Sequence, residues 1–309
     1  MFFQKKRINL HANTNWDMNT KGIFLVIATL ILLASSGMAQ KKYALLVGIS
    51  NYHALDKNNE WNDIHGANDI NLISQELKKQ KFQITVLLEK DATKSRIVTE
   101  LKKLKRSVKH GSIVYIHFSM HGQPYDDALS LVKGDEVWDE SLVPIDAPIA
   151  YDGRYKGNNH LVDDELNGYT EAIRNIIGKS GMIYVIIDAC HAGGASKGNG
   201  TSDITRGTKR GFTSIKGKRF RPSEERPTYF NLSTKAGQSP IIYLEACKGK
   251  EINTEMKFNG KYYGPMSFFI WQTISRKPIG TDTSWTEEVK ELMKKKGPQN
   301  QNMVIEKSK

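Results

Sequence analysis

The sequence contains little cysteine and none of the common zinc-binding patterns. Only Cys190 and Cys247 occur in the 309 residues, and neither a His-Glu-x-x-His nor a Cys-x-x-Cys sequence is present. Zinc hydrolases and zinc fingers rely on such closely spaced ligands, so both classes are disfavoured. Two cysteines could form one disulfide in a secreted protein. Because both follow strand-like apolar runs, we expect free thiols instead.

The N-terminal apolar run is too short to span a bilayer comfortably. Ile23 to Ala34 is twelve residues long, whereas a spanning helix needs about 20. Lys21 precedes the run and small residues follow it as far as Ala39, which is the pattern of a secretory signal peptide. We therefore predict a signal peptide over residues 1–39, cleaved after Ala39, with Met18 as an alternative start. A transmembrane anchor is the weaker alternative. The mature protein is expected to be secreted or periplasmic, with no stable membrane insertion.

The composition excludes a disordered chain, but the net positive charge needs an explanation. Hydrophobic residues make up 39% and charged residues 25%, as in ordinary globular proteins. The formal net charge of +12 draws attention to acidic partners. Aromatic and basic residues are not interleaved as they are in many nucleic-acid-binding proteins, so no nucleic-acid partner is expected. Binding to an anionic envelope or another polyanion is an alternative function.

From Lys41 onward, short apolar runs alternate with helical periodicity. The apolar runs predict strands at 43–48, 82–88, 112–118, 182–187 and 240–246. Apolar stripes at helical spacing predict helices over 67–77, 93–104 and 166–177, and another that begins at Pro265. This alternation predicts an α/β fold with a mostly parallel central sheet and helices on both faces. In such sheets, ligands bind at the carboxyl ends of the strands.

Two polar motifs follow the third and fourth predicted strands. His121 and Gly122 come after one strand, and Cys190 comes after the next. Because parallel strands end at the same edge of a sheet, we expect His121 and Cys190 to meet there. An imidazole beside a thiol makes the sulfur a nucleophile, and the amides of Gly122 and Cys190 could hold a developing oxyanion. Alone, either residue would more often be structural; the pair favours catalysis.

These motifs resemble those of metacaspases and bacterial orthocaspases. The likeness rests on His121-Gly122 and on the run from Asp188 to Gly193, and it extends from the first predicted strand to the helix after Pro265. The resemblance implies a caspase-like three-layer α/β fold and thiol peptidase activity, with His121 and Cys190 as the catalytic dyad. Peptides or proteins would be the substrates, and we expect a monomer.

The resemblance also implies a pocket for P1, the substrate residue before the cleaved bond. Asp69, Ser119 and Asp188 occupy the positions that line this pocket in the family. Two carboxylates in one pocket attract Arg or Lys and repel Asp, so hydrolysis after basic residues is expected. The alternative is that Asp69 only caps its helix.

A second acidic group resembles calcium ligands of calcium-activated metacaspases. It consists of Asp139, Asp163 and Asp164. Several carboxylates converging on a hard cation are chemically reasonable. The family's fourth acid falls near Lys197 here, which would repel the cation. Asp163 and Asp164 as charges at a helix N-terminus are the alternative. No required cofactor is expected.

A Lys- and Arg-rich stretch at 194–227 interrupts the alternation. We predict a mobile basic loop there, within a caspase-like peptidase domain at 40–298, and a frayed tail at 299–309. The loop could be a polyanion-binding patch or a solvated surface. For an enzyme that cuts after basic residues it is also a tethered substrate, so we favour self-processing within 197–226. The alternative to an active cysteine endopeptidase is a catalytically inactive caspase-like binding module.

Overall fold

The apolar runs form one central sheet whose carboxyl edge carries the candidate site. The computed structural model describes residues 40–131, 137–191, 204–221 and 232–308. Its strands are β1 (Lys42–Gly48), β2 (Gln83–Leu88), β3 (Ile113–Ser119), β7 (Met182–Asp188), β8 (Ile241–Glu245) and β11 (Val304–Lys307). They lie in the order β11-β8-β7-β3-β1-β2, and all pairs except β11 with β8 are parallel. The predicted signal peptide and Lys197 lie outside the described residues.

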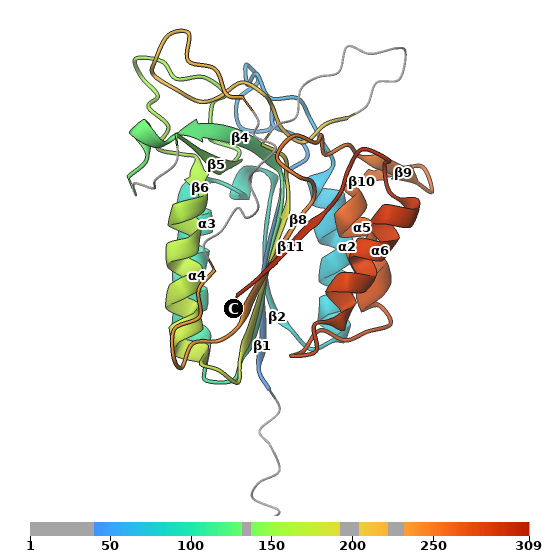
Figure 1. Cartoon of the computed structure of the whole chain (residues 1–309). Helices are drawn as coiled ribbons and strands as arrows, with labels where there is room; N and C mark the ends of the chain where they lie inside the picture. Colours follow the sequence, from blue (N-terminus) through green and yellow to red (C-terminus); the bar gives the residue numbers. More distant parts are fainter. Residues whose placement is uncertain (1–39, 132–136, 192–203, 222–231, 309) are drawn as a thin grey trace, which may run out of the picture. The chain divides into compact units, whose positions relative to one another are not determined.

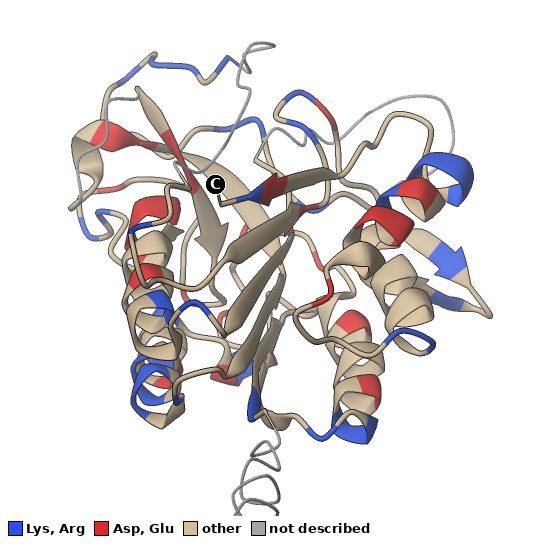
Figure 2. Ribbon diagram, turned by 60° about the horizontal axis from the view of Figure 1, so that its bottom comes forward, with Lys and Arg blue, Asp and Glu red and all other residues tan. Residues whose placement is uncertain are grey.

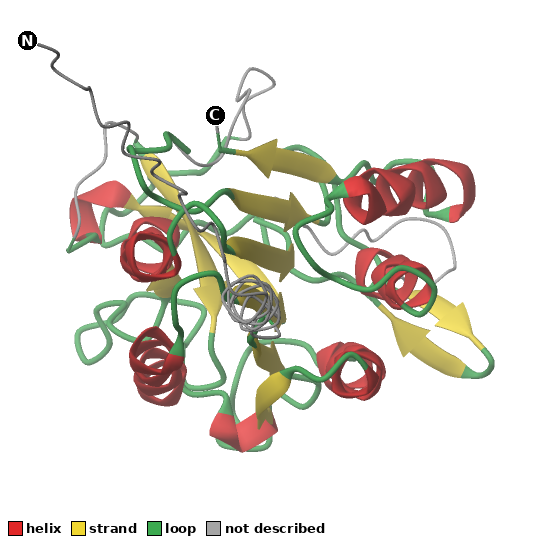
Figure 3. Ribbon diagram, turned by 90° about the horizontal axis from the view of Figure 1, so that it is seen from below, coloured by secondary structure: helices red, strands yellow, loops and turns green. Residues whose placement is uncertain are grey.

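Helices cover both faces of this sheet (Figures 1 and 3). One face carries α2 (Gly66–Lys79), α5 (Pro265–Ile274) and α6 (Ser284–Lys296), and the other carries α3 (Lys94–Ser107) and α4 (Asp163–Ile177). Local signals set several ends: Thr93 caps α3, Pro265 opens α5, and Gly178, with φ 63°, ends α4. Apolar clusters fill each side of the sheet, and Figure 2 shows charged residues mainly on helices and loops. The predicted three-layer α/β fold is confirmed.

Short elements surround the carboxyl edge. A small antiparallel sheet is formed by β4 (His121–Asp126), β5 (Trp138–Val143) and β6 (Leu161–Val162), and a hairpin by β9 (Met256–Phe258) and β10 (Lys261–Tyr263). Two 3₁₀ turns occupy Glu89–Asp91 and Asp127–Leu129. No helix in the described part of the chain is long and apolar enough to cross a membrane.

Two expectations about irregular segments are wrong. The tail predicted to fray at 299–309 contains β11, which pairs with the edge strand β8, and Gln301 and Met303 are buried. Pairing satisfies backbone groups that β8 would otherwise leave open. Residues 204–221, expected within a mobile loop, also pack against the domain: Arg206 and Phe212 are fully buried. The rest of the 194–227 stretch, at 194–203 and 222–227, lies outside the described residues.

Candidate active site

Strand register brings His121 and Cys190 to one edge of the sheet. β3 and β7 are neighbours, and Ser119 pairs with Asp188 at their ends. His121 and Cys190 each follow two residues later. Gly122 then lies against Cys190, because a Cβ at Gly122 would be only 2.7 Å from the Cys190 carbonyl oxygen. A side chain there would separate the two motifs, so this position requires glycine.

The His121 ring is oriented for proton transfer through Nδ1. Its Nε2 lies 2.8 Å from the carbonyl oxygen of Asn62, and Tyr52 and Trp61 pack on the ring at centroid distances of 4.7 and 4.8 Å. A carbonyl only accepts hydrogen bonds, so the proton belongs on Nε2 and the lone pair on Nδ1. In the described part of the chain, Nδ1 has no hydrogen-bond partner. Burial lowers the pKa of His121 to about 4, so the ring is neutral at neutral pH and Nδ1 carries a lone pair.

The Cys190 thiol is buried and hydrogen-bonded. It donates to the carbonyl oxygen of Glu251 at 3.0 Å and lies 3.2 Å from the sulfur of Cys247. Both cysteines are free thiols, as expected from the sequence. A thiol that donates a hydrogen bond carries its proton, so this arrangement holds Cys190 as a protonated thiol. Its hydrogen bond with Cys190, together with burial, holds the pKa of Cys247 well above the usual range, so this second thiol stays protonated.

Asp69, Ser119 and Asp188, predicted to line one pocket, do come together. They surround the guanidinium group of Arg206. Its Nη1 lies 2.7 Å from Asp69 Oδ2, 2.7 Å from Ser119 Oγ and 3.3 Å from Asp188 Oδ1. Its Nη2 and Nε lie 2.8 and 3.1 Å from Glu255 Oε1. The pocket is therefore an acidic, solvent-excluded site that already holds an arginine side chain.

Neighbouring donors hold the two aspartates in place. The Gly264 amide donates to Asp69, at 3.1 Å to Oδ1, and the Asn253 side chain and the Ser267 amide donate to Asp188 at 2.8 and 3.0 Å. A Cβ at Gly264 would lie 2.3 Å from Asp188 Oδ2, so only glycine lets the pocket close.

The pKa values of the ionisable groups in this pocket shift in different directions. Burial raises the pKa of Asp69 to about 7 against the opposing effect of Arg206. Burial also acts on Asp188, but there the Arg206 charge and the bonds from Ser267 and Asn253 prevail and lower its pKa. The surrounding carboxylates outweigh the burial of Arg206 and raise its pKa, so the guanidinium stays charged. An arginine in the pocket is therefore ionised and paired.

The backbone of Arg206 occupies the position expected for an oxyanion. The Cys190 amide donates to the Arg206 carbonyl oxygen at 2.8 Å. This amide is one of the two donors predicted for that role, and Gly122 lies beside it. The same residue thus fills the acidic pocket with its side chain and meets the nucleophile's own amide with its carbonyl group. Chemically, this is how a thiol peptidase would hold the residue before a bond to be broken.

Sequence reasoning missed two residues of the pocket. Glu255 lies after the fifth predicted strand, in a segment with no periodicity that would mark it as a pocket residue. Arg206 is one of many basic residues in a polar stretch, and no local signal separates it from Lys209 or Arg210. Only long-range contacts in the folded chain assign them to the pocket.

The proposed calcium ligands gather around α4. Asp163 is half-buried, and desolvation together with Glu140, Asp139 and Asp164 raises its pKa well above the usual range. Glu140 in turn pairs with His191 at 2.9 Å. Within the residues that the structure describes, no group of three or more His, Cys, Asp or Glu side chains is arranged to hold a metal ion. Asp163 and Asp164 also begin α4, where the helix dipole stabilises negative charge.

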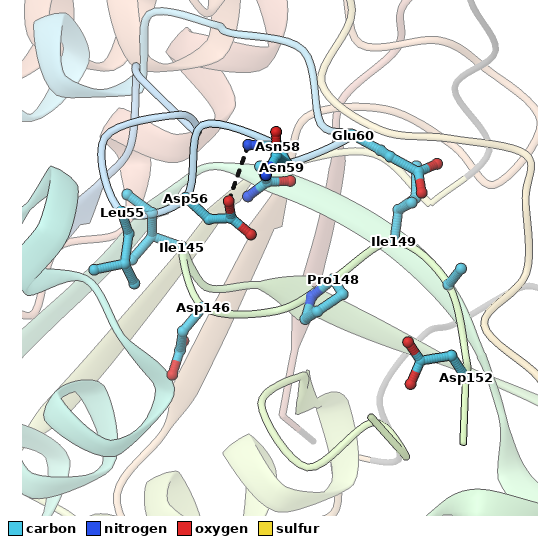
Figure 4. A pocket seen from close by; sticks show the side chains of 11 residues that line it. Leu55, Asp56, Asn58, Asn59, Glu60, Ile145, Asp146, Pro148, Ile149 and Asp152 are labelled. Carbon is cyan, nitrogen blue, oxygen red and sulfur yellow. Dashed lines mark hydrogen bonds between the residues drawn. The ribbon is translucent and has the colours of Figure 1, made fainter. Parts of the chain in front are cut away.

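A separate acidic hollow lies beside the site (Figure 4). Its volume is about 290 Å³, and it lies between the loop at 55–60 and the segment at 145–152. Neither His121 nor Cys190 lines it. Its acidic members are Asp56, Glu60, Asp146 and Asp152. Glu60 lies 3.5 Å from Arg210, so the rim of the hollow faces the chain that follows Arg206.

The fold and site define a caspase-like α/β protein with a histidine and a cysteine at one sheet edge. The sequence profile of the caspase domain matches residues 41–307, so the chain belongs to the caspase-domain family. The expected membership is confirmed.

Named relatives are distant. Metacaspase-2 of Arabidopsis thaliana is 31% identical over 167 residues, which are 50% of this chain and 35% of that protein. Metacaspase-1 of Meyerozyma guilliermondii is 23% identical, over 84% of this chain and 68% of the relative. The chain therefore spans about a third of the first relative's length and two thirds of the second's. A crystal structure of a Geobacter sulfurreducens protein matches with a TM-score of 0.57 at 16% identity, covering 87% of this chain and 93% of the other, which concerns the fold alone.

Proposed function

We propose that this protein is a cysteine endopeptidase that hydrolyses peptide bonds after basic residues, using His121 and Cys190. The observation that carries the proposal is Arg206, whose side chain fills an acidic pocket while its carbonyl oxygen accepts from the Cys190 amide at 2.8 Å. A pocket with three carboxylates neutralises a basic P1 side chain and would leave an acidic one unpaired. Family membership supports the same class of reaction.

The proposed reaction follows from the contacts of His121 and Cys190. His121 Nδ1 takes the thiol proton of Cys190, and the thiolate attacks the substrate carbonyl carbon. The developing oxyanion is held by the Cys190 amide, with Gly122 as the second proposed donor. His121 then gives its proton to the leaving amine, and water hydrolyses the thioester. Asn62 keeps the other ring nitrogen protonated throughout, so Nδ1 stays the working atom.

The P1 preference gives the direct test. On peptides that differ only at P1, kcat/KM should fall in the order Arg, Lys, Asp. Arg should exceed Lys by at least about tenfold, because Glu255 contacts both Nε and Nη2, and a hydrogen bond to a charged group contributes roughly 1.5–3 kcal/mol. Hydrolysis of fluorogenic peptides measures this order. A preference for Asp would overturn the pocket assignment, and no turnover of any peptide would favour an inactive binding module.

Calcium binding by Asp139, Asp163 and Asp164 is a further proposal. The raised pKa of Asp163 means that its charged form is disfavoured in the folded state at neutral pH, and a bound cation would relieve this cost. Asp163→Asn should therefore raise the Tm of calcium-free protein, by about 2–4 °C per kcal/mol relieved, and remove the further rise that calcium gives the wild type. Thermal unfolding with calcium and with chelator measures both. Equal Tm values in wild type under the two conditions would leave Asp163 and Asp164 as charges at the start of α4 and Asp139 as a strand residue without a metal.

Secretion, a monomeric state and self-processing within 197–226 complete the proposed function. Self-processing is supported by the basic side chain that already occupies the pocket, since it belongs to the same chain as the nucleophile. A tethered segment is present at high effective concentration, so cleavage within the molecule is favoured over cleavage between molecules.

A further inference from the structure

Part of the basic stretch, residues 204–212, crosses the site as an extended chain. On its amino-terminal side, the Arg206 amide donates to the Asn253 carbonyl oxygen at 3.0 Å, and the Glu255 amide donates to the Ile204 carbonyl oxygen at 2.9 Å. This antiparallel pairing aligns the residues that precede the pocket. With the Arg206 side chain held by carboxylates, the chain is fixed up to Arg206.

After Arg206, the chain follows the open edge of β4. β4 is the end strand of its small sheet, and the stretch runs parallel to it. The Phe212 amide donates to the Pro124 carbonyl oxygen at 2.7 Å, and the Asp126 amide donates to the Phe212 carbonyl oxygen at 2.9 Å. The Gln123 side chain donates to the Arg210 carbonyl oxygen at 2.8 Å. These bonds go to the backbone, so they would accept many sequences.

One side chain anchors this downstream stretch. Phe212 is fully buried in a seat of aromatic rings, which we call the aromatic seat. Its ring stacks on Tyr125 at 5.3 Å, and His160, Tyr155 and Tyr151 close around it at 4.6, 5.5 and 6.0 Å. Aromatic burial of this kind fixes a segment far more firmly than the exposed polar residues around it.

Arg206 differs from the other basic residues of 204–221. Arg210 and Lys218 pair with Glu60 and Asp126, at 3.5 and 2.6 Å, and the others are exposed. In this described stretch, Arg206 is the basic residue whose carbonyl oxygen meets the Cys190 amide. The residue that follows it is Gly207, where a Cβ would lie 1.8 Å from the Cys190 carbonyl oxygen, so only glycine passes this close to the nucleophile's backbone.

We infer that the edge of β4 and the aromatic seat form a binding site for the chain downstream of the cleaved bond, and that they select Arg206–Gly207 as the bond the enzyme breaks in itself. Phe212 is then a positioning residue: it does not touch the reacting atoms, but it holds the Arg206 carbonyl group in place from six residues away. This inference rests on the proposed function, because it needs an active His121–Cys190 dyad.

The reaction balances without any further reactant than water. The Cys190 sulfur bonds to the Arg206 carbonyl carbon, and the bond from that carbon to the Gly207 nitrogen breaks. His121 passes the thiol proton to the Gly207 nitrogen, which becomes a new amino terminus. Water then splits the thioester, leaving Arg206 as a carboxyl terminus and restoring the thiol. After the cut, the fragment that ends at Arg206 can leave the acidic pocket, while the fragment that begins at Gly207 stays anchored by Phe212.

The test is to incubate the purified full chain and to identify the new termini by intact-mass measurement and N-terminal sequencing. Wild type should yield a fragment that begins at Gly207, and Arg206→Ala should not. Arg210→Ala is the matched control: its side chain makes only an exposed pair with Glu60, so it should be cut at Arg206–Gly207 like the wild type.

Phe212 is tested by separating self-cleavage from peptide hydrolysis. Phe212→Ala should slow the cut at Arg206–Gly207 by at least tenfold or scatter it over other basic residues. Turnover of a short Arg peptide, which cannot reach the aromatic seat, should stay at or above the wild-type rate because the pocket empties more readily. Phe212→Leu keeps an apolar side chain and so is less prone to misfold. Its rate of self-cleavage should lie between those of wild type and Phe212→Ala. Thermal unfolding confirms that each variant is folded.

The outcomes distinguish the inference from the proposed function. If wild type hydrolyses Arg peptides but cuts itself at another bond, or not at all, the inference is wrong and the proposed function stands. An unchanged cut rate at Arg206–Gly207 in folded Phe212→Ala would remove Phe212 as the positioning residue. If wild type neither cuts itself nor hydrolyses Arg peptides, the proposed function fails first.

Discussion

Replacing Cys190 or His121 by alanine should lower hydrolysis of Arg peptides by at least about 10³-fold, because a nucleophile and its base act as a unit. The expected loss comes from the sulfur that forms the thioester and from the Nδ1 atom that accepts its proton. Steady-state kinetics on one fluorogenic Arg peptide, with wild type assayed in parallel, measures it. The alanine variants should also remain single chains.

Cys247 provides a matched control for this experiment. Its sulfur lies 3.2 Å from that of Cys190, it is also buried, and it has no histidine base assigned to it. Cys247→Ala should therefore retain most of the activity. Turnover near the wild-type rate by folded Cys190→Ala would end the cysteine-peptidase proposal, and loss of activity in Cys247→Ala alone would exchange the roles of the two thiols.

Removing the charge of Asp188 should have the second largest effect. Asp188→Asn keeps the size of the side chain but loses the carboxylate that faces a P1 arginine, so kcat/KM on Arg peptides should fall by about 30- to 5000-fold, the equivalent of roughly 2–5 kcal/mol. Hydrolysis of a peptide with a neutral P1 residue, which is slow in any case, should change little. The ratio of the two rates is the measurement.

Two comparisons sharpen the Asp188 result. Asp69→Asn should cost less near pH 7, because burial raises the pKa of Asp69 to about 7 and part of its charge is already absent there. Glu287→Gln changes an exposed carboxylate on α6, paired with Lys307, and should leave the ratio unchanged. Since Asp188 also pairs with Arg206 in the uncut chain, Tm is compared before rates are interpreted. An Asp188→Asn protein with an unaltered Arg preference would show that the pocket lies elsewhere.

The sequence alone was sufficient for the layers of the fold. β1, β3 and β7 are buried and mostly apolar runs, and the stripes of α2, α3 and α4 repeat at helical spacing, so each element carries its own local signal. Elements without such a signal were missed. β4 and β5 are short and partly polar, and β11 looks like an ordinary charged tail until it meets β8.

The sequence by itself also determined which chemistry gathers at the carboxyl edge. His121 and Cys190 follow neighbouring parallel strands, and Asp69, Ser119 and Asp188 lie at strand and helix ends beside them, so topology alone brings them together. The tertiary structure decided the rest: Glu255 as the third carboxylate, Asn62 as the partner of the His121 ring, and Arg206 as the residue in the pocket. These depend on pairing between segments far apart in the chain, where the energy of burial and hydrogen bonding, not local periodicity, selects one residue among several of the same type.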